Sequence, residues 1–227
     1  MAEPLILVPG VASDAQIWEG MPDGAVAMSD AGTIKGMARD ILAGAPPRFA
    51  LAGHSMGGYI ALAMMAQAPD RIARLALIST SAASDTPEQR AGRLQTMASA
   101  KADFEAVIQT LSRAMLSRES RADERIVDEV AAMIRRCGLA AFLRQQQAVL
   151  GRDDYRHMLA EIDVPVLIIT GEDDRVVAPA RSVELAEGIT GARLLSIPHC
   201  GHLPQREASM QVRAAMTEWL DGQGNQA

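Results

Sequence analysis

The chain has 227 residues, 48% of them hydrophobic, and a formal net charge of −6. This length suits one sizeable domain that can bury a core without disulfides or metal ions. The acidic balance and the 3% aromatic content argue against nucleic-acid binding, which needs a basic surface. Because no run of about 18 apolar residues is present, we also expect no membrane span.

The N-terminal residues and the cysteines indicate a cytoplasmic protein. Met1-Ala2-Glu3-Pro4 lacks the basic start of a secretory signal. Cys137 and Cys200 suit a reducing compartment, and no Cys-x-x-Cys spacing indicates zinc. We expect Cys137 to be buried on the apolar side of a helix, and we expect no catalytic role for Cys200.

The first third of the chain alternates between expected strands and helices. Residues 5–8 are entirely apolar and predict a strand covered on both faces, with a weaker strand at residues 25–28. Apolar residues at helical spacing predict a helix over residues 33–43. Residues 48–52 predict a buried strand, and residues 58–67 predict the helix that follows it.

The same alternation returns toward the C-terminus. The further strands are expected at residues 74–79, 164–170 and 192–197, and the further helices at residues 179–187 and 206–220. Residues 222–227 should form a frayed tail. Strands that alternate with helices indicate an α/β fold, with a mostly parallel twisted sheet of about six strands flanked by helices.

One long segment interrupts this alternation, because no strand is expected between residues 84 and 158. Apolar stripes predict helices there over residues 104–115 and 126–137, and a third near residues 142–149. We therefore expect a core made of residues 1–83 and 159–227 and a helical insertion of residues 84–158.

The pentapeptide Gly53-His54-Ser55-Met56-Gly57 is the most informative motif of the chain. It lies between an expected strand and an expected helix, which is the setting that exposes a nucleophilic serine above a sheet. The glycines suit such a turn because it is strained and crowded. The Gly-x-Ser-x-Gly pattern alone is weak evidence, but in this setting it predicts a reactive hydroxyl on Ser55.

Other reactive residues follow the expected strands. Gly10-Val11 follows the first strand, Glu172-Asp173-Asp174 follows the strand at residues 164–170, and His199 and His202 follow the last strand. The carboxyl ends of parallel strands share one edge of a sheet, where ligand sites collect. A serine, an acid and a histidine in this chain order are what a serine hydrolase on such a sheet requires.

Four segments in chain order resemble the α/β-hydrolase family: Leu7-Val8-Pro9-Gly10, Gly53-His54-Ser55-Met56-Gly57-Gly58, Gly171-Glu172-Asp173-Asp174-Arg175-Val176-Val177 and Cys200-Gly201-His202-Leu203. The resemblance implies that Ser55 is the nucleophile, His202 the base and Asp174 the acid that orients the base. It also implies an oxyanion hole made by the backbone N–H groups of Val11 and Met56, with no cofactor and no metal. In this family, a helical insertion at this place forms a cap over the active site.

The family pattern decides between neighbouring candidates for the acid. It favours Asp174, which comes three residues after a glycine and ahead of a valine-rich turn. Asp173 and Glu172 are then solvated loop carboxylates. Some members take the acid from the loop after an earlier strand, but here that loop has no carboxylate until Asp85.

The four histidines are sorted in the same way. His202 follows glycine and precedes the final helix as the family pattern requires, whereas His199 is expected to be structural or at the rim of the site. His54 should pack or make a local hydrogen bond, and His157 should be exposed. A metal site built from His54, His199 and His202 would leave the glycines and the serine turn unexplained.

The chain departs from the family in two places. Pro9-Gly10 stands where the family often has His-Gly, so a brace on that loop is lost while the N–H of Val11 remains. The chain also begins almost directly at the strand of residues 5–8. We therefore expect the α/β-hydrolase fold without its two leading strands.

The substrate pocket is expected to receive side chains from the insertion. Its methionines should mostly pack between helices, and they are Met97, Met115, Met133 and Met158. Trp18 is a candidate for the acyl side of the pocket, with core packing as its alternative. Arg144 and Gln145-Gln146-Gln147 are candidates because cap helices face the cleft.

These features predict a serine hydrolase that cleaves small carboxylic esters through an acyl-serine intermediate. Lactonase, thioesterase, carbon–carbon bond hydrolase and cofactor-free perhydrolase or haloperoxidase activities use the same three residues and stay open as alternatives. A non-catalytic ligand receptor of the same fold is a further alternative, which the three intact positions disfavour. The pattern predicts neither the acyl group nor the oligomeric state.

Overall fold

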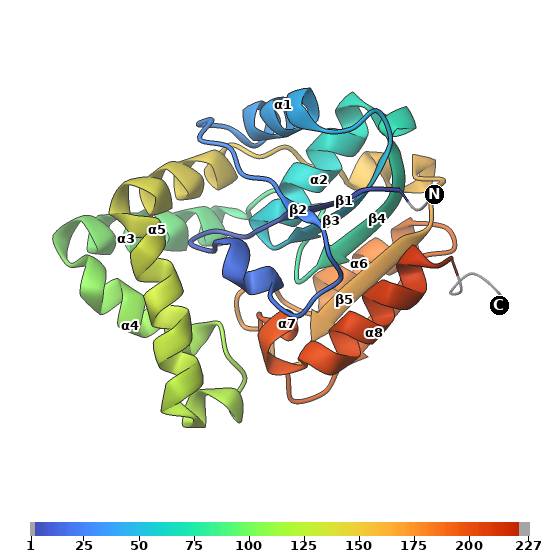
Figure 1. Ribbon diagram of the computed structural model, residues 1–227. Coiled ribbons are helices and arrows are strands. Elements are labelled where there is room, and N and C mark those ends of the chain that lie inside the picture. The colour runs from blue at the N-terminus through green and yellow to red at the C-terminus, as the bar shows by residue number, and fades with distance from the viewer. Residues whose placement is uncertain (1–2, 223–227) are drawn as a thin grey trace.

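A computed structural model describes residues 3–222 and contains one six-stranded sheet (Figure 1). The strands lie in the order β2-β1-β3-β4-β5-β6, and every neighbouring pair is parallel. Their bounds are β1 (Leu5–Val8), β2 (Ala25–Val26), β3 (Phe49–His54), β4 (Ile72–Ile78), β5 (Val166–Gly171) and β6 (Arg193–Ile197). The expected α/β fold with about six strands is confirmed, and the sheet is parallel throughout.

Helices cover both faces of this sheet, which explains the apolar sequence of its strands. In β1, Ile6 and Val8 belong to one core cluster, whereas Leu5 and Leu7 belong to the other. The first cluster includes residues of α1 (Ile34–Gly44), α2 (Met56–Gln67) and α6 (Ala180–Gly188). The second includes residues of α8 (Ser209–Leu220) and of the short 3₁₀ helix η1 (Ala15–Trp18).

The segment between β4 and β5 is helical, and within the described residues it contains no strand. Its helices are α3 (Pro87–Ala102), α4 (Phe104–Ala114) and α5 (Glu124–Leu150), with a 3₁₀ turn η3 (Ser120–Ala122) before α5 and another, η4 (Arg156–Glu161), after it. Figure 1 shows α3, α4 and α5 grouped together to one side of the sheet. Residues of α4 and α5 add Val107, Ile108, Val130 and Phe142 to the second core cluster.

One helix of this segment, α3, differs from the sequence-based expectation. Helix α3 was not among the expected helices because it has no apolar stripe, and Ala100 is its one buried residue. Its start signal lay in the sequence, since Thr86 and Gln89 form a capping box. The two helices expected over residues 126–137 and near residues 142–149 are both present. They are the two halves of α5, which meet at Gly138, where φ 75° and ψ 161° are not helical.

The C-terminal helix and Cys137 also differ from expectation. The helix expected over residues 206–220 is two helices, α7 (Pro204–Glu207) and α8, because the backbone of Ala208 is not helical, with φ −135° and ψ 44°. Cys137 is half-buried rather than fully buried, and this partial burial raises the pKa of its thiol to about 11. Most of the expected frayed tail, residues 223–227, lies outside the described residues.

A membrane crossing would require a long and strongly apolar helix. Across residues 3–222, none of the helices combines the necessary length with the necessary apolarity.

Candidate active site

Ser55 lies on the turn between β3 and α2, at the carboxyl edge of the sheet. Its backbone has φ 53° and ψ −114°, a combination that costs energy in any residue except glycine. The two flanking glycines make this turn possible because backbone approaches them closely. A Cβ atom on Gly57 would lie 2.0 Å from the carbonyl oxygen of Val8, and one on Gly53 would lie 2.3 Å from that of Gly57. The motif is therefore needed for close packing as well as for turn geometry.

Hydrogen bonds from the neighbouring strand hold this turn in place. The N–H of Ser55 donates to the carbonyl of Ile78 at 2.9 Å. The hydroxyl of Thr80 donates to the carbonyl of Ser55 at 2.8 Å, and this bond is buried. Two residues from the end of β4 and the loop after it thus fix the backbone that carries the serine hydroxyl.

His202 and Asp174 form a buried pair at the same edge of the sheet. The Nδ1 atom of His202 lies 2.8 Å from Oδ2 of Asp174, and the two side chains are 1% and 0% exposed. The other carboxylate oxygen, Oδ1, accepts from the N–H groups of Val176 and Val177 at 2.8 and 2.9 Å. Burial opposes ionisation of this carboxyl, but His202 and the two N–H groups outweigh it and lower the pKa of Asp174.

The neighbouring loops also fix the backbone of His202. Its N–H donates to the carbonyl of Met115 at 2.8 Å. One oxygen of Glu207 accepts from the N–H of Gly201 at 3.0 Å, and the other accepts from the N–H of Ser117 at 2.8 Å. The histidine loop is thereby joined to the segment that follows α4 within the helical insertion.

His54, the residue before Ser55, contacts the backbone of the histidine loop. It is completely buried, and its Nε2 lies 2.8 Å from the backbone carbonyl oxygen of His202. Because a carbonyl can only accept, Nε2 carries the proton and Nδ1 does not. The expected local hydrogen bond is therefore a long-range one, joining residues 148 positions apart. Burial and the nearby His202 lower the pKa of His54 to about 3.

This buried histidine should make the protein sensitive to acid. In the unfolded chain the pKa of a histidine is about 6.5, so between that pH and pH 3 the unfolded state binds more protons than the folded state. The free energy of unfolding should therefore fall with pH in this window, by up to about 1.4 kcal/mol per pH unit from His54 alone. We expect His54→Gln, which keeps a side-chain N–H donor but has no group that titrates in this window, to show a shallower slope.

Urea unfolding at about pH 6, 5 and 4 measures the slope. The control is His157→Gln, a change at an exposed histidine, which should keep the wild-type slope. Equal slopes for the wild type and His54→Gln would contradict the assignment of this proton uptake to His54.

The loop after β1 carries the predicted oxyanion donor Val11. The next N–H, that of Ala12, donates to Oε1 of Gln145 at 2.8 Å in a buried bond, and Ala12 has a positive φ of 54°. This glutamine from α5 braces the loop that Pro9-Gly10 was expected to leave unbraced. The second predicted donor, Met56, is the first residue of α2, so its N–H has no acceptor within the helix.

A cavity of about 90 Å³ lies over Ser55 and His202. It is lined mainly by apolar side chains from both the sheet loops and the insertion: Val11, Ala12, Tyr59, Leu111, Met115, Ile134, Phe142, Val149, Val176 and Val177. Arg93 and Gln146 add the further polar groups. Trp18 is not among the residues that line this cavity in the described structure; it is 4% exposed and belongs to the apolar core. The structure thus favours the core-packing alternative for Trp18, because its indole is enclosed by other apolar side chains.

The remaining candidates lie away from the His202–Asp174 pair. Glu172, Asp173 and His199 are exposed. Asp85 forms salt bridges with Arg93 and Arg152, at 2.9 and 2.7 Å. Arg144 is paired with Asp30, and Gln147 is exposed.

Cys200 is buried, and burial raises the pKa of its thiol, so the reactive thiolate is disfavoured. Among residues 3–222, no group of three or more His, Cys, Asp and Glu side chains is arranged to hold a metal ion.

Comparison with known proteins places this architecture in a family. The family pattern of the α/β-hydrolase fold matches residues 43–209, which include Ser55, Asp174 and His202. The chain belongs to the α/β-hydrolase family.

Two proteins of related chemistry are similar to this α/β-hydrolase in sequence. It is 30% identical over 176 residues to a pimeloyl-[acyl-carrier protein] methyl ester esterase of Neisseria meningitidis, a match that covers 75% of this chain and 68% of that esterase. It is 31% identical over 173 residues to a putative carbamate hydrolase of Rhizobium rhizogenes, a match that covers 73% of this chain and 65% of the relative.

A solved structure is similar over nearly the whole α/β-hydrolase. A thermophilic esterase from Thermogutta terrifontis, determined with malate bound, superposes with a TM-score of 0.84 and 26% sequence identity. The superposition covers 99% of this chain and 91% of that esterase. The family resemblance expected from the four sequence segments is therefore confirmed.

Sequence reasoning missed several residues that support the site of this α/β-hydrolase. Thr80, Gln145 and Glu207 bond to backbone groups of the serine turn, the loop after β1 and the histidine loop, respectively. The sequence suggests Gln145 only as a residue that contacts substrate, and Thr80 and Glu207 belong to no recognisable motif. A polar residue within an apolar stripe, such as Gln145 in α5, was the one available signal.

Proposed function

We propose that this α/β-hydrolase cleaves small carboxylic esters through an acyl intermediate on Ser55. The observation that carries the proposal is the buried His202–Asp174 pair, 2.8 Å apart, whose histidine lines the same cavity as a serine held in a strained turn. A serine hydroxyl is a weak nucleophile at neutral pH and needs an adjacent base. The arrangement supplies a base whose orientation is fixed by a carboxylate.

The geometry suggests how each group would act. Because Nδ1 of His202 faces Asp174, Nε2 is the atom free to take the proton of Ser55 as the hydroxyl attacks the ester carbonyl. The N–H groups of Met56 and Val11 would bind the oxygen that becomes negatively charged. His202 would then give its proton to the leaving alcohol, and a water molecule activated by the same base would release the acid.

The helical insertion, residues 84–158, would serve as the cap of this site. Leu111 and Met115 from α4 and its end, and Phe142 and Val149 from α5, contribute to the cavity wall together with the loops of the core. A cap of this kind excludes water from the acyl-enzyme and strengthens polar interactions inside the site. The small apolar cavity favours a short acyl chain or a slender one.

The relatives support ester chemistry. The Neisseria meningitidis protein is named a methyl ester esterase, and the Thermogutta terrifontis protein is named an esterase. The Rhizobium rhizogenes protein is named a putative carbamate hydrolase, and a carbamate also presents a carbonyl to a nucleophile. We therefore place carboxylic esters first among the substrates to be tested.

The experiment combines labelling with turnover. The wild-type protein should react with a fluorophosphonate probe at Ser55 and should hydrolyse p-nitrophenyl esters of short acids. A panel of acetyl, butyryl and hexanoyl esters, with the matching thioesters, gives the acyl preference. Peracid formation from acetate and hydrogen peroxide would identify the perhydrolase alternative. A protein that is neither labelled nor active on any of these esters would contradict the proposal.

A further inference from the structure

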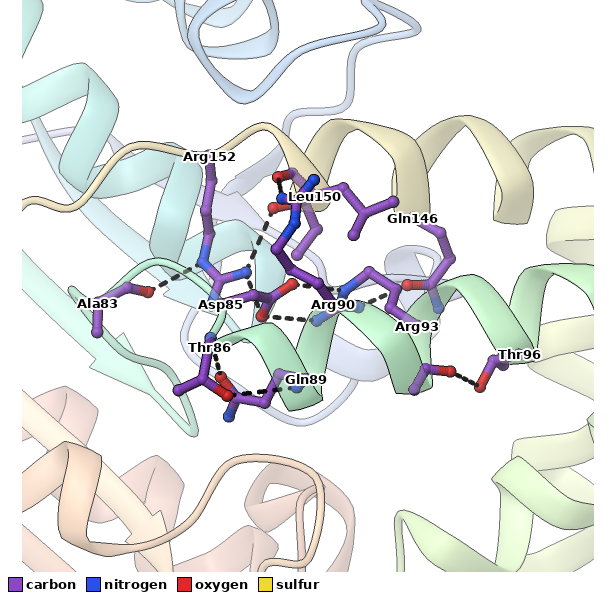
Figure 2. A network of polar contacts seen from close by, with 12 residues as sticks. Ala83, Asp85, Thr86, Gln89, Arg90, Arg93, Thr96, Gln146, Leu150 and Arg152 are labelled. Carbon is purple, nitrogen blue, oxygen red and sulfur yellow. Dashed lines mark hydrogen bonds and ion pairs between the residues drawn. The ribbon is translucent and has the colours of Figure 1, made fainter.

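A buried ionic cluster lies where the helical insertion joins the core (Figure 2). Asp85 follows β4, and its carboxylate contacts Nε of Arg93 in α3 at 2.9 Å and Nη1 of Arg152, just after α5, at 2.7 Å. The side chains of Asp85 and Arg152 are 2% and 6% exposed, and that of Arg93 is 21% exposed. Figure 2 shows the carboxylate between the two guanidinium groups.

This cluster carries one more positive charge than negative charge. Burial opposes ionisation of Asp85, but the two arginines outweigh it and lower the pKa of the carboxyl, so it is ionised at neutral pH. In the part of the chain that the structure describes, neither arginine has a second carboxylate within ion-pair distance. Their other partners are neutral. Arg93 donates to the amide oxygen of Gln146 at 2.5 Å. Arg152 donates to the backbone carbonyls of Ala83 and Val149 at 3.1 and 3.3 Å, and its guanidinium lies 4.4 Å from the centre of the Tyr59 ring.

The excess charge faces a second cavity, which adjoins the cavity over Ser55. This outer cavity has a volume of about 510 Å³ and is lined by Arg93, Arg152, Arg175 and Arg181 as well as by Asp85. Tyr59, Arg93 and Gln146 line both cavities.

Two of the four arginines of the outer cavity lie outside the ionic cluster. Arg181 is paired with Glu184 at 2.9 Å, whereas Arg175 is exposed and has no ion-pair partner among residues 3–222. The outer cavity is therefore positively charged in a protein whose net charge is −6.

We propose that the outer cavity is an anion-binding subsite, and that the preferred ester carries a carboxylate or phosphate group at the end remote from the scissile bond. This inference rests on the proposed function and deepens it. A guanidinium presents a rigid fork of donors that matches a carboxylate or phosphate in two parallel hydrogen bonds. Asp85 and Gln146 hold Arg93 in position, so little side-chain freedom is lost when an anion binds.

The substrate pairs that test this subsite differ only in the remote group. One series is the monomethyl esters of succinate, glutarate, adipate and suberate, and the other is the methyl esters of the monocarboxylic acids of the same lengths. Methanol release measures both series with one assay. We expect kcat/KM to be higher for the acidic member of at least one pair. Inhibition of methyl butanoate hydrolysis by adipate and by inorganic phosphate then distinguishes a carboxylate site from a phosphate site.

The variants test whether the arginines cause the preference. Arg93→Gln should lower the ratio of kcat/KM for the acidic ester to that for the neutral ester by about ten-fold to a hundred-fold, the usual effect of losing a hydrogen bond to a charged group. Arg175→Gln, at an exposed residue, should lower the same ratio by a smaller factor and keeps the test open if Arg93→Gln does not fold. Arg213→Gln, at an exposed arginine of α8, is the control and should leave the ratio unchanged.

The results separate this inference from the proposed function. If Ser55 is labelled and neutral esters are cleaved, but no acidic ester is preferred and neither adipate nor phosphate inhibits, the anion subsite is overturned while the esterase stands. The subsite is also overturned if Arg93→Gln and Arg175→Gln both fold and leave the wild-type ratio intact. If no ester is cleaved and Ser55 is not labelled, the esterase proposal fails and the inference fails with it.

Discussion

Replacing Ser55 with alanine should abolish fluorophosphonate labelling and lower kcat for ester hydrolysis by roughly 10⁴- to 10⁶-fold, the range seen when a nucleophile of this kind is removed. The reason is that alanine has no atom to form the acyl bond, whereas the turn and its hydrogen bonds to Ile78 and Thr80 involve only the backbone of residue 55. The fold should survive, so circular dichroism and unfolding temperature should be close to those of the wild type.

Ser79 provides a matched control for this experiment. It is also buried, also follows a parallel strand, and also has a positive φ, 47° against 53° for Ser55. Its hydroxyl has no hydrogen-bond partner in the described structure. Ser79→Ala should therefore keep labelling and turnover. Labelling that persists in Ser55→Ala, or that disappears in Ser79→Ala, would contradict the role given to Ser55.

Asp174→Asn should lower kcat by roughly 10⁴-fold while leaving the shape of the site intact. Oδ1 of Asp174 accepts from the N–H groups of Val176 and Val177, and the carbonyl oxygen of asparagine can keep both bonds. Its NH₂ group would then take the place of Oδ2 and donate to Nδ1 of His202. The proton of the neutral imidazole would be forced onto Nε2, and the histidine could no longer act as a base toward Ser55.

Asp173→Asn is the control for the acid, because this neighbouring carboxylate is exposed. It should leave kcat within about two-fold of the wild type, as surface substitutions usually do. Steady-state rates on a short p-nitrophenyl ester measure both variants. Full activity in Asp174→Asn together with a large loss in Asp173→Asn would move the acid by one residue and refute the assignment.

The strands were predictable because their sequences are apolar on both faces. Helices cover β1, β3, β4 and β5 on both faces, so side chains on both faces of these strands are buried. These strands therefore contain continuous apolar runs in the sequence, such as Leu5–Val8. Helix α3 was not predictable in the same way, since its one buried residue is Ala100 and it leaves no apolar periodicity. An apolar periodicity arises because one face of a helix is buried. A helix with almost no buried face, such as α3, therefore shows no such periodicity in its sequence.

The position of the charged and polar groups depended on contacts between distant segments. Asp85 was considered as a possible acid for the histidine, yet it is held by Arg93 from α3 and by Arg152 from beyond α5. Gln145 reaches across 133 positions to the N–H of Ala12. Neither pairing has a spacing or motif along the chain, because the atoms meet only after the insertion has folded onto the core.

The sequence by itself determined the α/β fold, the family and the chain order of the candidate serine, acid and histidine, because each depends on local rules: apolar runs, turn glycines and short motifs. Only the tertiary structure showed which side chains from distant segments contact one another. It brought His202 to within 2.8 Å of Asp174 and His54 to within 2.8 Å of the carbonyl of His202. It also placed an outer cavity lined by four arginines beside the cavity over Ser55. Contacts of this kind depend on the three-dimensional packing of segments whose separations along the chain carry no periodic signal.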